Sequence, residues 1–195
     1  MKDFKTFVNE NLLVPRNLEG RKEKLKQMNI KLLSQEVVDG DLILDESFMD
    51  IDAKFVKLKK VNDCVILTGG LWTEIPEWLK NVEVLGYFSC AGNKLTTMKN
   101  CPAVIHGNIN CADNKLITLE GSPEIINGNF HCSSNMLTSL KGCPKIINGS
   151  FSCSYNKLTS LEGCPETING NLYCITKPTL ELPDYVKLKG EFVNK

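Results

Sequence analysis

Three residue types recur every 21 residues through the middle of this chain. Cysteine does so at Cys90, Cys111, Cys132, Cys153 and Cys174. Glycine keeps the same spacing at Gly86, Gly107, Gly128, Gly149 and Gly170, and asparagine at Asn93, Asn114, Asn135 and Asn156. A fixed period of this length indicates stacked coils, each making one circuit and contacting its neighbours. The sequence therefore predicts a solenoid, which favours a binding surface over a catalytic pocket.

One coil illustrates which side chains are expected to face the core. Residues 126–133 alternate between apolar or small and polar side chains, a period of two that predicts a strand with one buried face. Asn135 follows, and its amide is expected to bond backbone groups of neighbouring coils and so form a ladder. Gly142 makes the next corner, because glycine adopts dihedrals that other residues avoid. The predicted inward residues are Ile126, Gly128, Phe130, Cys132, Leu137 and Leu140.

Nine cysteines would suggest a disulfide scaffold in a secreted chain. Here the number is odd, the N-terminus lacks the apolar core of a signal peptide, and a second cysteine column contains a serine at position 122. The spacing between coils does not by itself forbid a bridge. We nevertheless expect free, buried thiols that act as small hydrophobic groups. No CxxC pair or Cys/His cluster occurs, so no metal site is expected.

Composition and motifs argue against several functional classes. The formal net charge is zero, so neither a nucleic-acid partner nor a membrane partner is expected, and no apolar run approaches the roughly 20 residues of a membrane span. Motifs for catalysis or phosphate binding are missing, which predicts a non-enzymatic protein without cofactors or catalytic residues. An acidic cluster is interpreted as a solvated loop rather than a cation site; it comprises Asp45, Glu46, Asp50 and Asp52. A cytoplasmic location is expected.

The chain is expected to have two parts. Residues 1–37 are predicted to form a helical hairpin that caps the first coil, because an open solenoid end exposes apolar surface and strand edges. Its first helix would use Phe4, Phe7, Val8 and Leu12; its second, from Leu18 to Leu33 beyond Pro15, would use Leu25, Met28, Leu32 and Leu33. Residues 38–195 are predicted to form the solenoid, most regular over 86–174. Its first coils are about 23 residues long, and an insertion within 75–86 adds a helical turn.

The segment Phe130-x-Cys132-x-x-Asn135-x-Leu137-x-x-Leu140 resembles the leucine-rich repeat pattern LxLxxNxLxxL. The match recurs at Phe88–Met98, Ile109–Leu119 and Phe151–Leu161. The short period and the LT-x-L corner look most like the bacterial-effector subtype, some members of which begin with a helical hairpin. This resemblance implies a parallel β-sheet that lines a concave face. The glycine before each strand and the Cys-Pro corner depart from that subtype, and a straighter parallel β-solenoid is the alternative.

The N-terminal segment MKDFKTFVNE resembles the targeting peptide of internal head proteins in T-even-type phages. In that family a short Met-Lys-x-aromatic segment ends in glutamate and is removed by the prohead protease. The corresponding residues here are Met1, Lys2, Phe4, Phe7 and Glu10, with cleavage expected after Glu10. The resemblance implies a phage origin and packaging in the virion; an ordinary amphipathic capping helix is the alternative.

The outward strand positions form the candidate site. They are small, polar and nearly uncharged, with tyrosines toward the ends, and tyrosine is a frequent hot-spot residue in interfaces. We therefore expect a phage-encoded interaction protein that binds or inhibits a bacterial host protein, with a packaged head component and a glycan- or small-ligand-binding solenoid as alternatives. The candidate partner-binding residues are Tyr87, Ser89, Asn108, Asn110, Asp113, Asn129, His131, Ser152, Tyr155, Asn171 and Tyr173.

Overall fold

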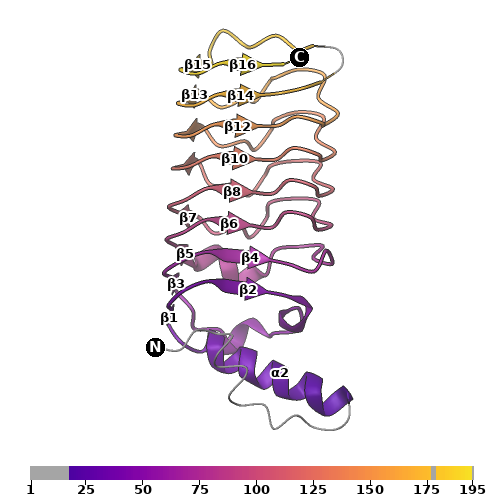
Figure 1. Ribbon diagram of the computed structural model, residues 1–195, viewed down its shortest axis with the longest axis vertical. Coiled ribbons are helices and arrows are strands. Elements are labelled where there is room, and N and C mark those ends of the chain that lie inside the picture. The colour runs from indigo at the N-terminus through magenta and orange to yellow at the C-terminus, as the bar shows by residue number, and fades with distance from the viewer. Residues whose placement is uncertain (1–17, 177–178, 195) are drawn as a thin grey trace.

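The computed structural model describes residues 18–176 and 179–194. Within them the chain winds into coils that stack along one axis (Figure 1). Each coil adds one short strand to an eight-stranded sheet in which all pairings are parallel. The strands, in stacking order, are β2 (Leu42–Leu44), β4 (Val65–Leu67), β6 (Phe88–Ser89), β8 (Ile109–Asn110), β10 (Phe130–His131), β12 (Phe151–Ser152), β14 (Leu172–Tyr173) and β16 (Phe192–Val193).

A second side of the column carries two four-stranded parallel sheets, one above the other along the stack. The first contains β1 (Val37–Val38), β3 (Lys60–Val61), β5 (Glu83–Val84) and β7 (Val104–Ile105). The second contains β9 (Ile125–Ile126), β11 (Ile146–Ile147), β13 (Thr167–Ile168) and β15 (Lys187–Leu188). The molecule is thus a parallel β-solenoid, as the 21-residue period predicts.

The coils stack in register, so residues of one repeat column lie directly above one another. Phe130 pairs with Phe151, and their rings are stacked with centroids 5.6 Å apart. All five cysteines of the 21-residue column are fully buried, which confirms their inward orientation. All nine cysteines of the chain are unpaired, and eight of them are buried. The thiols therefore act as core groups, as expected.

The single strand expected over residues 126–133 is wrong in one respect. The chain bends at Asn127 and Gly128, so β9 and β10 belong to different sheets. Glycine is required at this bend because the coils approach closely there: a Cβ atom on Gly107 would lie 2.6 Å from the carbonyl oxygen of Gly86 in the preceding coil. The repeated glycine therefore marks a corner rather than an inward strand position.

The predicted asparagine ladder is confirmed. The Asn135 side chain is buried. Its Oδ1 accepts from Leu116 N at 2.9 Å, and its Nδ2 donates to Cys111 O at 3.0 Å and to Cys132 O at 3.1 Å. The equivalent asparagines at positions 93, 114 and 156 bond in the same way. Each side chain therefore ties its own coil to the preceding one.

One helix, α2 (Leu18–Leu33), lies across the N-terminal end of the column (Figure 1). Met28 and Leu33 are buried, and the Asn29 amide donates to Ser47 Oγ at 2.8 Å. The second helix of the expected hairpin is thus confirmed; the first falls on residues 1–17, outside the described part of the chain. None of the helices in the described residues is long and apolar enough to span a membrane.

Three 3₁₀ helices occupy the first coils: η1 (Glu46–Phe48), η2 (Ala53–Phe55) and η3 (Glu77–Asn81). The last is the helical turn expected from the insertion within residues 75–86. Paired residues of these coils are 23 positions apart in sequence, for example Asn62 and Asp39, whereas later coils keep a separation of 21. The extra residues therefore form additional loop structure outside the sheets.

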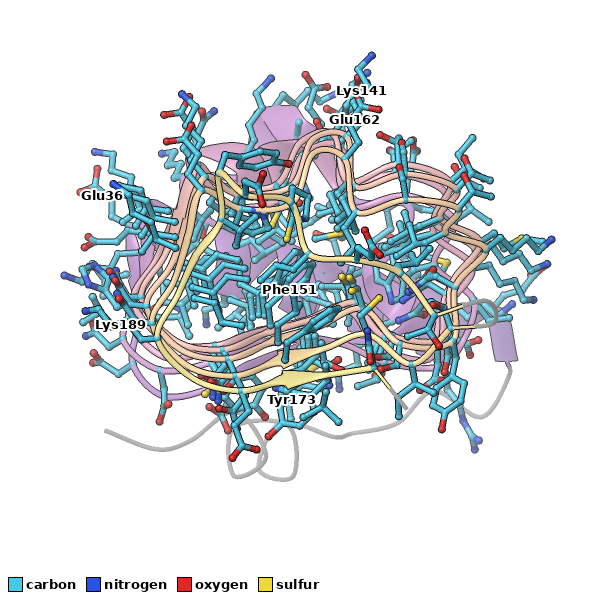
Figure 2. All side chains as sticks on the ribbon, turned by 90° about the horizontal axis from the view of Figure 1, so that it is seen from above. Glu36, Lys141, Phe151, Glu162, Tyr173 and Lys189 are labelled. Carbon is cyan, nitrogen blue, oxygen red and sulfur yellow. The ribbon has the colours of Figure 1, made fainter. Side chains whose placement is uncertain are left out.

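The column is straight. The strands of the eight-stranded sheet lie above one another in Figure 1, and the coils overlay when seen from above in Figure 2. The sheet is thus a flat side of the molecule instead of the expected concave face. Straightness has a physical basis here, because both sides of the column carry parallel sheets, and parallel strands keep nearly the same spacing of about 4.8 Å wherever they pair.

Candidate interaction surface

The outer side of the eight-stranded sheet, called here the eight-stranded face, carries a central row with one side chain per coil. Figure 2 shows the contrast within neighbouring coils: Phe151 lies inside the column and Tyr173 outside. The row is half-buried in its middle and more exposed at Ile43 and Tyr173. It contains Ile43, Ile66, Ser89, Asn110, His131, Ser152, Tyr173 and Val193.

A second row, beside the glycine corner, forms a ladder along the edge of this face. The Asn108 side-chain oxygen accepts from Asn129 N at 2.7 Å, and the Asn129 oxygen accepts from Ser150 N at 2.7 Å. The series continues through Ser150 Oγ to Asn171 N and through Asn171 Oδ1 to Glu191 N. Each of these side-chain oxygens accepts from a backbone N–H of the next coil, so the ladder contributes to stacking.

A third row lies just beyond the strands, where the backbone adopts positive φ. Gly92, Asp113, Ser134 and Tyr155 occupy equivalent positions with φ between 56° and 67°. Tyr155 is 65% exposed, the largest fraction among the exposed large hydrophobic residues described. Positive φ is unfavourable for a bulky side chain, so the stacked coils must hold Tyr155 in this conformation. The ring consequently projects into solvent.

The predicted site residues therefore divide into two groups. Asn108, Asn129 and Asn171 belong to the edge ladder. Ser152 Oγ lies 2.7 Å from Ser133 Oγ, and Tyr173 Oη accepts from the Asn171 amide at 2.9 Å. The second group has no side-chain hydrogen-bond partner among the described residues; it comprises Tyr87, Ser89, Asp113, His131 and Tyr155. The amide nitrogen of Asn110 also has no partner there, although its side-chain oxygen accepts from Ala112 N.

Desolvation shapes the electrostatics of this face. Half-burial lowers the pKa of His131, so the imidazole is neutral at pH 7. Burial, reinforced by neighbouring acidic groups, raises the pKa of Tyr87. Both groups are therefore uncharged hydrogen-bonding groups on a nearly uncharged surface, an arrangement that suits a protein partner better than a nucleic acid.

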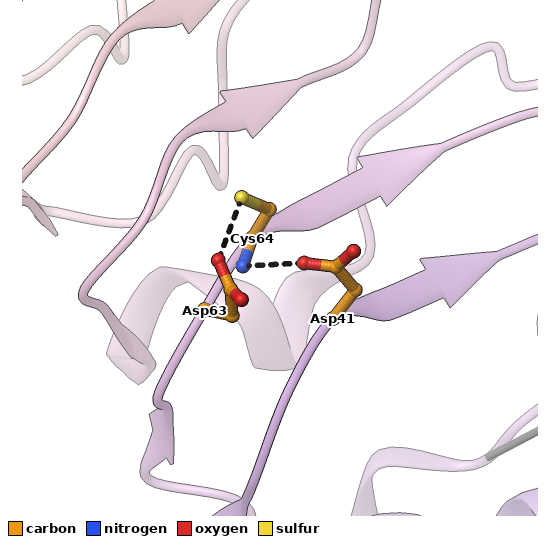
Figure 3. Close-up of side chains that lie close together, drawn as sticks. All are labelled: Asp41, Asp63 and Cys64. Carbon is orange, nitrogen blue, oxygen red and sulfur yellow. Dashed lines mark hydrogen bonds between the residues drawn. The ribbon is translucent and has the colours of Figure 1, made fainter. Parts of the chain in front are cut away.

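Three potential metal ligands meet at the N-terminal end of the edge row (Figure 3). Single ligand atoms of Asp41, Asp63 and Cys64 all lie within 4.8 Å of one another. Asp41 accepts from Cys64 N at 3.1 Å, the same contact that Asn108 makes further along, and the Cys64 thiol donates to Asp63 at 3.1 Å. Burial raises the pKa of Cys64 to about 12, so the thiol stays protonated and is a poor ligand at neutral pH. Coil stacking accounts for this cluster.

The acidic loop singled out in the sequence is explained by local capping. Asp45 accepts from Ser47 N and begins η1, and Asp52 accepts from Lys54 N and begins η2. Asp52 also forms an exposed ion pair with Lys54 at 2.7 Å. Two of the four carboxylates therefore have a structural role, consistent with a solvated loop.

Comparison with known proteins finds no match: no family model, no curated protein and no solved structure matches this chain. The structure itself shows a parallel β-solenoid with coils of about 21 residues and a helix across its N-terminal end. The side chains on the surface of the solenoid are therefore the basis of its function.

Two features were missed in the sequence. The positive-φ row was detectable in principle, because Gly92 shares its 21-residue column with Asp113 and Tyr155, but a single glycine in a column is a weak signal. The second is a groove between the first coils that contains both tryptophans. The change of period from 23 to 21 residues indicated extra loop residues in the first coils. Which side chains these loops bring together depends on tertiary packing, so the groove itself could not be predicted.

Proposed function

We propose that the protein is a non-enzymatic interaction module whose eight-stranded face binds another protein. The observation that carries the proposal is the exposed aromatic set on that face: Tyr87 is 39% exposed, Tyr155 65% and Tyr173 36%. Rigid aromatic anchors surrounded by small polar groups are typical of protein-binding surfaces, because few rotamers are lost on binding. The straight column holds these anchors at fixed spacings.

The finer identity is also a proposal. The repeat pattern supports a leucine-rich-repeat-like protein, although the straight column departs from the concave form of that family. The N-terminal resemblance to phage targeting peptides supports a phage-encoded protein that acts on a bacterial host protein in the host cytoplasm. That N-terminal segment lies outside the described residues, so the partner class rests on sequence alone.

Affinity capture tests the binding face. A tagged protein is incubated with lysate of the bacterial host, and co-purifying proteins are quantified by mass spectrometry. The test variant combines Tyr87→Ala, Tyr155→Asn and Tyr173→Ala; asparagine is used at position 155 because it tolerates positive φ. A matched control removes comparable exposed apolar surface elsewhere through Val104→Ala, Ile117→Ala and Ile125→Ala.

The proposal predicts one enriched protein that the control variant retains and the tyrosine variant loses by at least tenfold. Equal capture by both variants would show that the partner binds elsewhere. If no protein is enriched and virions contain a chain that begins at Asn11, the packaged head component is the better account. Saturable binding of a glycan on an array, with no captured protein, would favour the ligand-binding alternative.

A further inference from the structure

Both tryptophans of the chain line one groove at the N-terminal end of the column. The groove has a volume of about 340 Å³ and lies between the η1–η2 loop of one coil and the loop before η3 of the next. Its buried floor includes Phe48, Ile51, Trp72 and Trp78. Trp72 is fixed by a hydrogen bond from its indole nitrogen to Leu44 O at 3.3 Å. The side chains of the floor are therefore apolar and already in place, whereas the exposed lining of the groove as a whole is more polar than apolar.

The walls of the groove expose apolar side chains that the coil stack does not need. Met49 is 38% exposed and Leu71 44%. Both lie in the 23-residue coils, whose extra residues form the 3₁₀ helices, whereas the 21-residue coils stack without such loops. Insertions into a repeat often lie on a binding face, and exposed apolar patches with polar rims mark interaction sites. The extra loop residues thus build a surface instead of extending the core.

Two carboxylates lie on the rim of the groove. Among the described residues, the charged side chains that line it are Glu74 and Glu77. Glu77 is paired with Lys80 at 2.9 Å, whereas the structure, over its described residues, gives no partner for the exposed Glu74 carboxylate. A ligand that places an apolar group on the tryptophans and a cation beside Glu74 would satisfy both features. A basic group is therefore the complementary one.

We propose that this groove binds a short polypeptide segment carrying a large apolar side chain next to a lysine or arginine. A segment of chain fits better than a small molecule, because the groove is open and both Met49 and Leu71 must be covered along its length. The site is separate from the eight-stranded face and does not depend on the function proposed for that face.

Intrinsic tryptophan fluorescence tests the proposal on the full chain, since both indoles report on this groove alone. The probe is the peptide acetyl-Lys-Leu-Phe-Lys-amide, which contains no tryptophan. Three comparison ligands are titrated in parallel: acetyl-Glu-Leu-Phe-Glu-amide, acetyl-Lys-Ser-Ser-Lys-amide and phenethylammonium. We expect a saturable emission change with the first peptide and at least tenfold weaker binding of the other three.

Two groove variants are compared with two matched controls. Leu71→Ser and Glu74→Lys should each weaken probe binding at least fivefold, whereas Ile117→Ser and Glu162→Lys, exposed positions on other coils, should leave it unchanged. Circular dichroism verifies that each variant is folded; Met49→Ser replaces any that is not. Absence of saturable binding, equal binding of the acidic peptide, equal binding of phenethylammonium, or full binding by the groove variants would each overturn the proposal.

Discussion

One asparagine side chain per coil forms hydrogen bonds that join neighbouring coils of the stack. Asn135 satisfies an amide of the preceding coil and carbonyls of both coils, all in a buried position. Unpaired buried backbone groups cost about 1–3 kcal/mol each, so one side chain prevents several such penalties. Its regular recurrence is therefore explained by coil stacking and does not indicate a ligand site.

Replacing Asn135 with alanine should lower the free energy of unfolding by about 3 kcal/mol or more, because Leu116 N and the carbonyls of Cys111 and Cys132 lose their partner. Urea unfolding at neutral pH measures the effect. Met136→Ala is the control, since Met136 is adjacent and 40% exposed. A change below 1 kcal/mol for Asn135→Ala would show that the ladder is not a major source of stability.

Sequence columns identify inward residues well but cannot separate two kinds of outward residue. Phe130, Cys132 and Leu137 are buried as the period requires. Asn108 and Asn110, in contrast, both appear as outward polar residues, yet the first bonds the next coil and the second bonds within its own strand end. The difference depends on the corner between the two sheets, which the alternating pattern does not reveal.

At the level of the coil, the corner glycine sets how closely neighbours approach. The φ of Gly107 lies outside the left-handed region, yet an added Cβ would lie 2.6 Å from Gly86 O. Gly92 is the opposite case: its φ is +67°, and no atom lies within 4 Å of an added Cβ. One glycine is required by contact between backbones, and the other only by its own conformation.

Two alanine substitutions should therefore differ in cost. Gly107→Ala must push two backbones apart and should destabilise the protein by more than 2 kcal/mol. Gly92→Ala should cost about 1 kcal/mol, the penalty for positive φ in open space. Thermal or urea unfolding of both variants provides the comparison. Equal costs would contradict the close approach of the coils at the corner.

The elements that the sequence did not predict arise from that same corner. A strand was expected to run continuously through residues 126–133, because alternation persists on both sides of Gly128. Alternation reports which side chains are buried, and it survives when a strand bends around the core. The second face, with its two four-stranded sheets, was missed for this reason.

The whole molecule is held together around a core unusually rich in thiols. Burial is the main reason that the pKa is raised for seven of the nine cysteines, to about 12 for Cys64, Cys90 and Cys164. The pKa of Cys153 is raised first by its hydrogen bond to Cys174 and then by burial. Cys174 is the exception: a hydrogen bond from the Cys153 thiol lowers its pKa. In the unfolded chain all nine should titrate near pH 8.5.

Stability should consequently be lost in alkali. A raised pKa in the folded state means that the stabilising contribution is complete below about pH 8.5 and falls as the unfolded thiols ionise and the folded ones do not. Because most of the thiols contribute in this direction and Cys174 opposes them, the free energy of unfolding should fall by several kcal/mol between about pH 8.5 and pH 10. Urea midpoints between pH 7 and 10 measure this. Cys101→Ser, which copies Ser122 of the same column, should reduce the slope; a midpoint independent of pH would contradict burial of the thiols.

The flat eight-stranded face and the separate groove both require the coils to stack in register along a straight axis. The straight axis can be tested by comparing the separations of two residue pairs that lie on opposite sides of the column. Ile43 and Tyr173 lie six coils apart on the eight-stranded face, and Val37 and Thr167 lie six coils apart on the other sheets. A straight column makes the two separations equal, whereas a curved one shortens the separation on its concave side.

The decisive measurement is the distance between spin labels on each of these pairs, attached through an introduced keto amino acid so that the native thiols stay unmodified. On the eight-stranded face, six paired steps of about 4.8 Å give about 29 Å between backbones. On the other side five steps are strand pairings and the sixth joins the two sheets between β7 and β9, so a straight column gives the same value there. The structure predicts two narrow distributions with the same centre near that value. A pair on the eight-stranded face that is shorter by 5 Å or more than the pair on the other side, or a broad distribution for either, would contradict a straight, in-register solenoid.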